Sequence, residues 1–196
     1  MLTFKNFNVA DWLSFYRIAV VPVLFFFLWV GDRQTFTWIL LISYGTDALD
    51  GFLARKFNMS SARGAQLDSL GDQMTFLVSL AGLWIFENAF IRDHLFLITL
   101  AFAPYLIQML LAVTKYGKAT AFHTYLAKVS AIIQAVFILY TLFFSPIHSL
   151  FYLMIAIGIL ETLEEIVLIF LYDKWVKDVK GIYWALRDIR FKNKCT

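Results

Sequence analysis

Four aspartates lie close together in a strongly apolar part of the sequence. A carboxylate is costly to place inside a membrane, and those found there usually have a functional role. Carboxylate oxygens are preferred ligands of hard divalent cations, so four of them meeting at one point suit Mg²⁺ or Mn²⁺. Two such ions would balance the four negative charges. The group consists of Asp47, Asp50, Asp68 and Asp72.

The spacing of these aspartates predicts two helices that face each other. Positions three or four residues apart lie on one face of a helix, so Asp47 shares a face with Asp50. Asp68 shares a face with Asp72 in the same way. The short, polar stretch 56–64 is expected to form the turn that brings the two acidic faces together near one membrane surface. Small residues on these faces allow the helices to approach closely, namely Gly51, Ala54 and Gly64.

The composition around this motif is that of an integral membrane protein. Of the 196 residues, 61% are hydrophobic and only 16% are charged, which is outside the usual range of soluble domains. Six apolar runs have about the 20 residues that a helix needs to cross the hydrocarbon core. We therefore expect an all-α protein with six transmembrane helices and a single domain over residues 1–196. The runs lie near residues 18–31, 35–54, 65–86, 94–114, 124–144 and 150–172.

Lysines and arginines predict the orientation of these helices. They gather in the N-terminal segment, in the turns 55–63 and 115–123, and after Asp173, and basic segments of this kind face the cytoplasm. The aspartates would open toward the same side. Residues 1–16 and 174–192 have the amphipathic pattern of interfacial helices. The basic side suits anionic membrane lipids, and nucleic acid is not expected as a partner.

The aspartate pattern resembles the signature of the CDP-alcohol phosphotransferase family. Members of this family are membrane enzymes that make phospholipids from CDP-activated lipids or alcohols. Six spans, an amphipathic N-terminal helix and a length near 200 residues are also similar to a minimal member. The positions that match the signature are Asp47, Asp50, Gly51, Ala54, Arg55, Gly64, Asp68 and Asp72.

This resemblance implies a role for each matched residue. Two Mg²⁺ or Mn²⁺ ions would be held by Asp47, Asp50, Asp68 and Asp72. Asp72 would also act as the catalytic base, removing a proton from an acceptor hydroxyl that attacks CDP-diacylglycerol and releases CMP. The cytidine nucleotide would be surrounded by Gly51, Ala54, Arg55 and Gly64. A homodimer in a bacterial or archaeal cytoplasmic membrane is the expected state.

The acceptor alcohol is less well defined by the sequence. Members that act on glycerol 3-phosphate often have Pro and Lys after the third and fourth aspartates, where this chain has Ser69 and Gln73. The segment 68–70 is more similar to relatives that accept serine or inositol phosphate, but the Phe-Gly-Val-Ala-Pro run of the serine group is missing. Basic residues favour a phosphorylated acceptor, namely Arg63, Lys115, Lys118 and Lys128. Glycerol 3-phosphate is therefore preferred, with serine or inositol phosphate as alternatives.

Two other classes of membrane protein also use acidic residues. A prenyltransferase would carry two acidic motifs on well-separated helices, and this chain has one compact motif. A divalent-cation transporter would carry acidic residues through the depth of the membrane, and the last apolar run offers one further group. An active-site, dimer-contact or structural role is compatible with that group, which consists of Glu161, Glu164 and Glu165.

Overall fold

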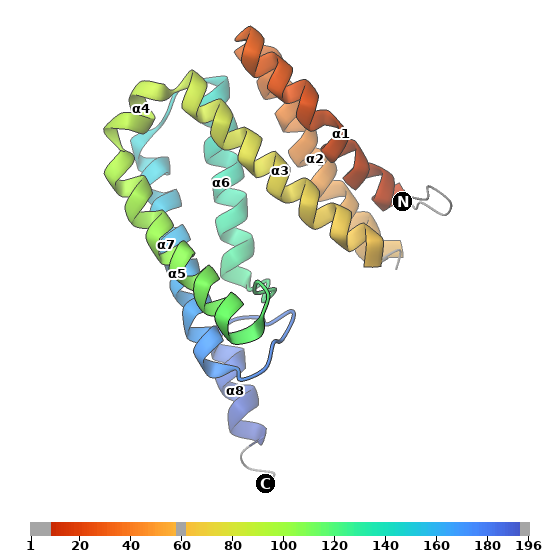
Figure 1. Cartoon of the computed structure of the whole chain (residues 1–196), viewed down its shortest axis with the longest axis vertical. Coiled ribbons are helices and arrows are strands. Elements are labelled where there is room, and N and C mark those ends of the chain that lie inside the picture. The colour runs from red at the N-terminus through yellow and green to blue at the C-terminus, as the bar shows by residue number, and fades with distance from the viewer. Residues whose placement is uncertain (1–8, 58–61, 193–196) are drawn as a thin grey trace. The chain divides into compact units, whose positions relative to one another are not determined.

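Helices account for nearly all of the described structure, as the apolar runs predict (Figure 1). The computed structural model describes residues 9–57 and 62–192, with no strand among them; side chains at 9–11, 48, 50–57, 62–69 and 189–192 lie outside this description. The predicted all-α fold class is confirmed. The helices are α1 (Val9–Val30), α2 (Arg33–Phe57), α3 (Ala62–Phe86), α4 (Asn88–Asp93), α5 (Leu95–Tyr116), α6 (Tyr125–Phe143), α7 (His148–Leu171) and α8 (Ile182–Lys192).

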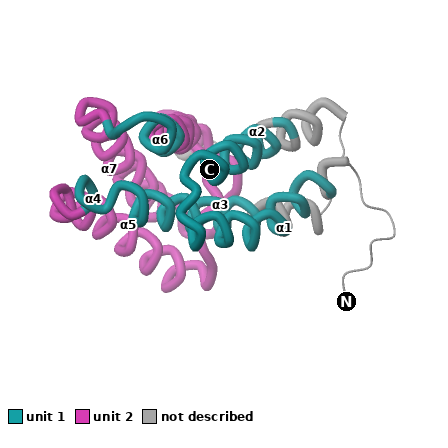
Figure 2. The backbone as a smooth tube through the Cα atoms, turned by 90° about the horizontal axis from the view of Figure 1, so that it is seen from above, with its two compact units in different colours: residues 1–91, 138–146 teal, residues 92–137, 147–196 magenta. Residues whose placement is uncertain are grey.

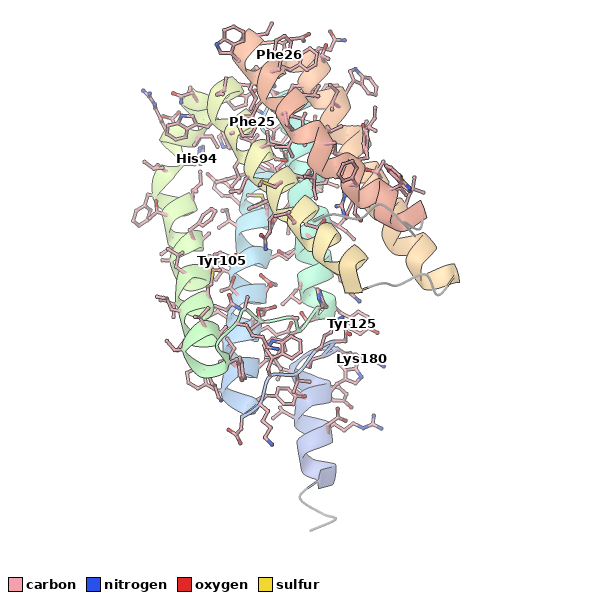
Figure 3. All side chains as sticks on the ribbon, turned by 45° about the vertical axis from the view of Figure 1, so that its right-hand side comes forward. Phe25, Phe26, His94, Tyr105, Tyr125 and Lys180 are labelled. Atoms are coloured by element: carbon pink, nitrogen blue, oxygen red, sulfur yellow. The ribbon has the colours of Figure 1, made fainter. Side chains whose placement is uncertain are left out.

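A long helix covers each of the six predicted runs. Three of these helices are long and apolar enough to cross a membrane, over Trp12–Val30, Leu95–Tyr116 and Tyr125–Phe143. The others carry the acidic residues: α2 and α3 hold the aspartate motif, and α7 holds the three glutamates. Apolar side chains point outward on the apolar helices, as Phe25 and Phe26 of α1 and Tyr105 of α5 do in Figure 3. Such surfaces suit contact with lipid, so the protein is a membrane protein with at least three candidate spans.

The helices near the two chain ends have other bounds than the predicted interfacial helices, whose position in the membrane interface stays a prediction. Residues 9–16 continue into the first apolar run, because α1 has no break between Val9 and Val30. The structure of residues 1–8 is outside the described part. At the other end, α8 begins only at Ile182, and residues 173–181 form an extended connection. Positive φ angles at Asp178 (58°) and Gly181 (148°) interrupt the amphipathic pattern there.

The chain divides into two compact units, which are described separately (Figure 2). Unit 1 comprises residues 1–91 and 138–146, and unit 2 comprises residues 92–137 and 147–196. In unit 1, α1 packs against both α2 and α3. The ring of Phe36 fills the space beside Gly82, where a Cβ atom would lie only 2.5 Å from the ring. A larger residue at position 82 would therefore push α2 and α3 apart.

Arg33 fixes the end of unit 1 opposite to the aspartate motif. Its guanidinium donates hydrogen bonds to the carbonyl oxygens of Leu142 (2.7 Å) and Thr141 (2.6 Å), and it forms an ion pair with Glu87 (2.6 Å). The carbonyls at the end of a helix have no partner within that helix, so Arg33 satisfies the last turn of α6. Next to it, hydrogen bonds from Thr35 lower the pKa of Asp32 before the start of α2.

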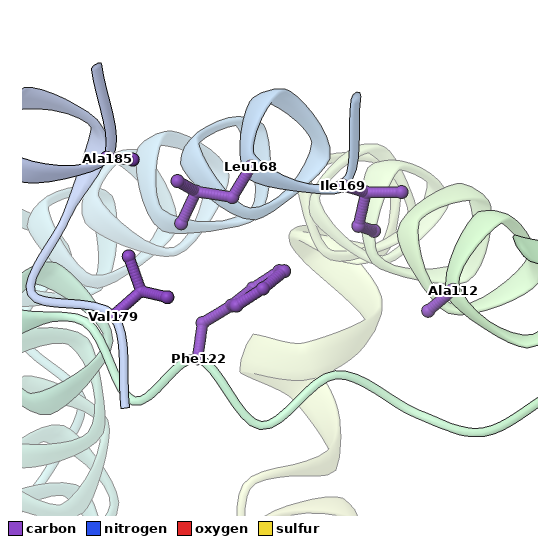
Figure 4. Close-up of a cluster of buried hydrophobic side chains, with 6 residues drawn as sticks. All are labelled: Ala112, Phe122, Leu168, Ile169, Val179 and Ala185. Atoms are coloured by element: carbon purple, nitrogen blue, oxygen red, sulfur yellow. The ribbon is translucent and has the colours of Figure 1, made fainter. Parts of the chain in front are cut away.

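Unit 2 is organised around Phe122, which lies in the connection between α5 and α6. Its ring is buried in an apolar cluster with Ala112, Leu168, Ile169, Val179 and Ala185 (Figure 4). The backbone N–H groups of residues 178 and 179 donate to the carbonyls of residues 121 and 122, at 3.1 and 2.7 Å. This pairing joins the extended connection 173–181 to the connection 117–124. It holds the beginning of α8 against α7.

Candidate active site

Three helices of unit 1 meet at a cluster formed by Arg17, Asp47 and Asp72. One atom of Arg17, Nη1, donates hydrogen bonds to Oδ1 of Asp47 and to Oδ1 of Asp72, the latter at 2.5 Å. Arg17 comes from α1, Asp47 from α2 and Asp72 from α3. Two aspartates that are 25 positions apart in the motif are thus brought to a single cation.

The packing of α1 explains why Arg17 lies in this position. Its buried residues recur at intervals of three or four, which is the pattern of one helix face, and they are Ser14, Arg17, Val21, Leu24 and Leu28. This face lies against α2 and α3. Arg17 is therefore the charged member among the described buried residues of this face. It lies beside Gly71, where an added Cβ atom would be in ordinary contact at 3.5 Å from its guanidinium carbon.

The two aspartates are much more accessible than the arginine that joins them. The side chain of Arg17 is 1% exposed, whereas those of Asp47 and Asp72 are 42% and 53% exposed. The cluster therefore has a buried cationic side and an open carboxylate side. An open carboxylate can reach a substrate or an ion, which a fully enclosed ion pair cannot do.

Further polar contacts join α2 and α3 next to the cluster. The hydroxyl of Tyr44 lies 3.0 Å from Oγ of Ser79, and Ser79 donates in turn to the carbonyl oxygen of Thr75 at 2.6 Å. Tyr44 is one helical turn before Asp47, and Thr75 is one turn after Asp72. The Tyr44–Ser79 contact joins α2 to α3, whereas the Ser79–Thr75 bond lies within α3.

The remaining motif positions are described only as backbone. Their side chains lie outside the described part of the structure, and they are Asp50, Gly51, Ala54, Arg55, Gly64 and Asp68. The backbone places the first four near the end of α2 and the last two near the start of α3. The motif thus spans two consecutive helices joined by a short connection, as its spacing predicts.

The described carboxylates are suitable for a divalent cation. Asp47 and Asp72 already share one positive charge, and their oxygens are the ligand type that Mg²⁺ and Mn²⁺ prefer. Among the residues whose side chains are described, no group of three or more His, Cys, Asp or Glu is placed to hold a metal ion. The two other motif aspartates are not among those residues. The described part of the site thus supplies two of the four predicted oxygen ligands, and metal binding stays a prediction.

The basic residues predicted to bind a phosphorylated acceptor have local partners in unit 2. Lys115 donates to the carbonyl oxygen of Ile169 at 2.8 Å, and the ammonium of Lys118 lies 3.5 Å from the ring centre of Trp175. Lys128 lies over the ring of Tyr125 at 5.5 Å. Arg63, the fourth of these residues, lies outside the described side chains.

The glutamates of α7 have neutral hydrogen-bond donors. Oε2 of Glu165 accepts hydrogen bonds from Gln108 of α5 (2.6 Å) and from Thr120 (2.7 Å). Oε1 of Glu164 accepts one from the backbone N–H of Ile182, the first residue of α8, at 3.3 Å. Glu161 lies next to Thr162, whose hydroxyl is 3.5 Å from its Oε2. Two of the three glutamates thus connect α7 to other segments of unit 2.

Arg17 is not part of the aspartate motif, although its place in the sequence indicates a candidate functional residue. It lies between apolar residues of the first long helix, and a charged residue at such a site is a candidate for function or for pairing. Its partners are 30 and 55 residues away. Local spacing does not reveal contacts of that range.

Together, the helices and the carboxylate cluster define a membrane protein with an acidic centre. Comparison with known proteins then identifies its family. The family model described as CDP-alcohol phosphatidyltransferase matches residues 7–169. This chain therefore belongs to the CDP-alcohol phosphatidyltransferase family and is a phosphatidyltransferase.

Relatives with a curated name support the same family. A CDP-diacylglycerol–glycerol-3-phosphate 3-phosphatidyltransferase of Wigglesworthia glossinidia brevipalpis is 29% identical over 196 residues, covering 95% of this chain and 98% of the relative. Proteins of the same name match over shorter stretches. The one from Yersinia pestis (strain Pestoides F) is 34% identical over 37% of this chain and 42% of its own length. The one from Salmonella choleraesuis (strain SC-B67) is 33% identical over 42% of this chain and 46% of its own length.

Proposed function

We propose that this protein transfers a phosphatidyl group from CDP-diacylglycerol to glycerol 3-phosphate and releases CMP. The names of the relatives supply this donor and acceptor. The structural observation that carries the proposal is the meeting of Asp47 and Asp72 at one cation, with both carboxylates half open. A site of this kind can hold a metal-bound pyrophosphate and accept a proton.

Asp72 is the proposed general base. It accepts the proton of the acceptor hydroxyl, and the freed oxygen attacks the phosphorus next to the diacylglycerol. The bond from that phosphorus to the bridging oxygen breaks, and the electron pair leaves with CMP. No covalent intermediate on the protein is needed. The exposure of Asp72 supports this role because a base must reach the substrate.

The four motif aspartates are the proposed ligands of two Mg²⁺ or Mn²⁺ ions, namely Asp47, Asp50, Asp68 and Asp72. When bound, such ions stabilise the negative charge that develops on the pyrophosphate. The chain's own contribution is to orient the carboxylates, which the packing of α1 against α2 and α3 supports. The proposed nucleotide contacts are Gly51, Ala54, Arg55 and Gly64.

The proposed membrane arrangement has six spans, formed by all the long helices. The length of α2, α3 and α7, from 24 to 25 residues, supports this, although their acidic residues lower their hydropathy. The motif faces the cytoplasm of a bacterial cell in this arrangement. In α8, the exposed side chains of Tyr183 and Leu186 support a position in the membrane interface. A homodimer is the proposed assembly, and residues 1–196 form its single domain.

Glycerol 3-phosphate is preferred over serine or inositol phosphate as the acceptor because every named relative given above uses it. Ser69 and Gln73 still depart from the pattern that is common for this acceptor. An assay must therefore compare acceptors directly.

The decisive experiment measures CMP release from cytidine-labelled CDP-diacylglycerol by the purified protein with Mg²⁺ or Mn²⁺. Release that depends on glycerol 3-phosphate is the expected result. Release with serine or inositol phosphate alone would change the acceptor but preserve the reaction. Absence of release with every acceptor, together with metal uptake into vesicles that contain the protein, would overturn the proposal in favour of a divalent-cation transporter.

A further inference from the structure

A buried positive charge lies at the centre of the candidate site. Arg17 has 1% of its side chain exposed, and its ion pairs join it to Asp47 and Asp72. A buried charge is tolerated only where opposite charges and hydrogen bonds compensate for lost hydration. The two aspartates therefore supply the opposite charge that the buried arginine requires.

The contact geometry places the arginine on the oxygens that a metal would use. The same atom, Nη1, contacts Oδ1 of each carboxylate. Carboxylate oxygens are also the ligands that a divalent cation prefers, so Arg17 and a metal ion would use the same two carboxylates. The two cations would compete for these oxygens because like charges repel, and the burial of Arg17 weakens the screening of that repulsion.

The arginine has a clear effect on the protein without metal. Two carboxylates that face each other repel, and a shared cation removes that repulsion. Arg17 comes from a third helix, so its ion pairs also hold α1 against α2 and α3 at the level of the motif. The protein can thus fold with the two aspartates already close together.

From these contacts we propose that Arg17 is a built-in cation that exchanges with the divalent metal at Asp47 and Asp72. This inference rests on the proposed metal-dependent function. Without metal, Arg17 keeps the two carboxylates together; when metal binds, its ion pairs to their Oδ1 atoms are replaced. Arg17 is therefore a positioning residue that competes with the metal and keeps its affinity moderate.

The test compares Mn²⁺ binding by the wild-type chain and by Arg17→Gln, measured by the electron paramagnetic resonance signal of free Mn²⁺. Glutamine is uncharged and cannot compete, so Mn²⁺ should bind about tenfold more tightly. Thermal unfolding gives a second readout. In the presence of a metal chelator, Arg17→Gln should unfold at a lower temperature than wild type. Addition of Mn²⁺ should raise the unfolding temperature of Arg17→Gln by more than it raises the unfolding temperature of wild type.

A matched control comes from the other end of the same unit. Arg33 also pairs with a carboxylate and satisfies helix carbonyls, but its partners, such as Glu87 and Leu142, are not in the motif. Arg33→Gln should lower the unfolding temperature equally with Mn²⁺ and with chelator. Its Mn²⁺ affinity should equal that of wild type. A purely structural role of Arg17 would give the same pattern as this control.

The outcomes separate this inference from the proposed function. If wild type binds no Mn²⁺, the metal-dependent function is wrong. If wild type binds Mn²⁺ and Arg17→Gln binds it equally or more weakly, the exchange is wrong and the metal site remains. If Arg17→Gln does not fold, Arg17→Lys serves as the test variant. Its shorter side chain holds the carboxylates less well, so Mn²⁺ affinity should rise by about threefold. An unchanged Mn²⁺ affinity in this variant overturns the exchange.

Discussion

Each unit of the molecule holds carboxylates within a long helix, but the two units satisfy them in different ways. In unit 1, Asp47 and Asp72 share a buried arginine and remain about half exposed. In unit 2, Glu165 accepts hydrogen bonds from Gln108 and Thr120, which carry no charge. The first group keeps a cation at its centre, whereas the second uses its charge to order neighbouring segments.

The two groups of carboxylates thus differ in their partners, which are a cation in unit 1 and neutral donors in unit 2. Glu165 fixes the connection after α5, and Glu164 fixes the first residue of α8. Both bonds stabilise the structure around Phe122, where the connections 117–124 and 173–181 pair. A cation at Asp47 and Asp72 can be replaced by another cation. Neutral donors at a glutamate offer no such exchange, so we expect chemistry in unit 1 and a structural role in unit 2.

The largest expected effect is the loss of turnover in Asp72→Asn. The amide has the shape of the carboxylate but cannot accept the proton, and loss of a general base costs roughly 10²- to 10⁴-fold in rate. CMP release should fall by at least that factor. Binding of CDP-diacylglycerol and the circular dichroism spectrum should be retained.

The matching change in unit 2 is Glu165→Gln. If the comparison holds, this variant keeps CMP release within a small factor of wild type, because its carboxylate does no chemistry. A loss of release as large as that of Asp72→Asn, in a protein that is still folded, would remove the distinction between the two units. Normal turnover in Asp72→Asn would instead refute its role as the base.

A smaller effect is expected on the stability of unit 2 when the Glu165 side chain is removed. Glu165→Ala leaves the donors of Gln108 and Thr120 without this acceptor, and an unsatisfied buried polar group costs about 1–3 kcal/mol. The midpoint of thermal or denaturant unfolding should fall accordingly. Asp173→Ala is the control, since that side chain is fully exposed and its nearest ammonium is 3.9 Å away. An equal shift in both variants would contradict the assignment.

The sequence predicts the helices and the position of the motif well. Each apolar run corresponds to a long helix, because about 20 mostly apolar residues favour one continuous helix in a membrane, even with Pro22 inside α1 and Pro104 inside α5. The spacing of the aspartates correctly places Asp47 and Asp72 on separate helices that lie together. Both predictions rest on local periodicity, which can be read directly from the sequence.

Contacts between distant residues are the part that the sequence does not predict. The predicted interfacial segment ends at residue 16 and the first span is expected from residue 18, so neither includes Arg17, yet α1 continues through it and buries it. The start of α8 is missed for a similar reason. An amphipathic pattern runs from residue 174, but backbone pairing with residues 121 and 122 keeps residues 178 and 179 out of a helix. In both cases tertiary contacts override a local pattern.

The smallest effect is expected at Glu164, whose carboxylate lies at the N-terminus of α8. A negative charge there interacts favourably with the helix dipole, typically by 0.3–1 kcal/mol, and Oε1 also accepts the hydrogen bond from Ile182. Glu164→Gln keeps an acceptor but loses the charge, so the amides of α8 should exchange hydrogen a few times faster while CMP release is unchanged. Faster exchange throughout α7 as well would mean that Glu164 stabilises the whole of unit 2. Reduced CMP release would instead give Glu164 a functional role like that of the aspartates. Either result would contradict the distinction between functional carboxylates in unit 1 and locally structural ones in unit 2.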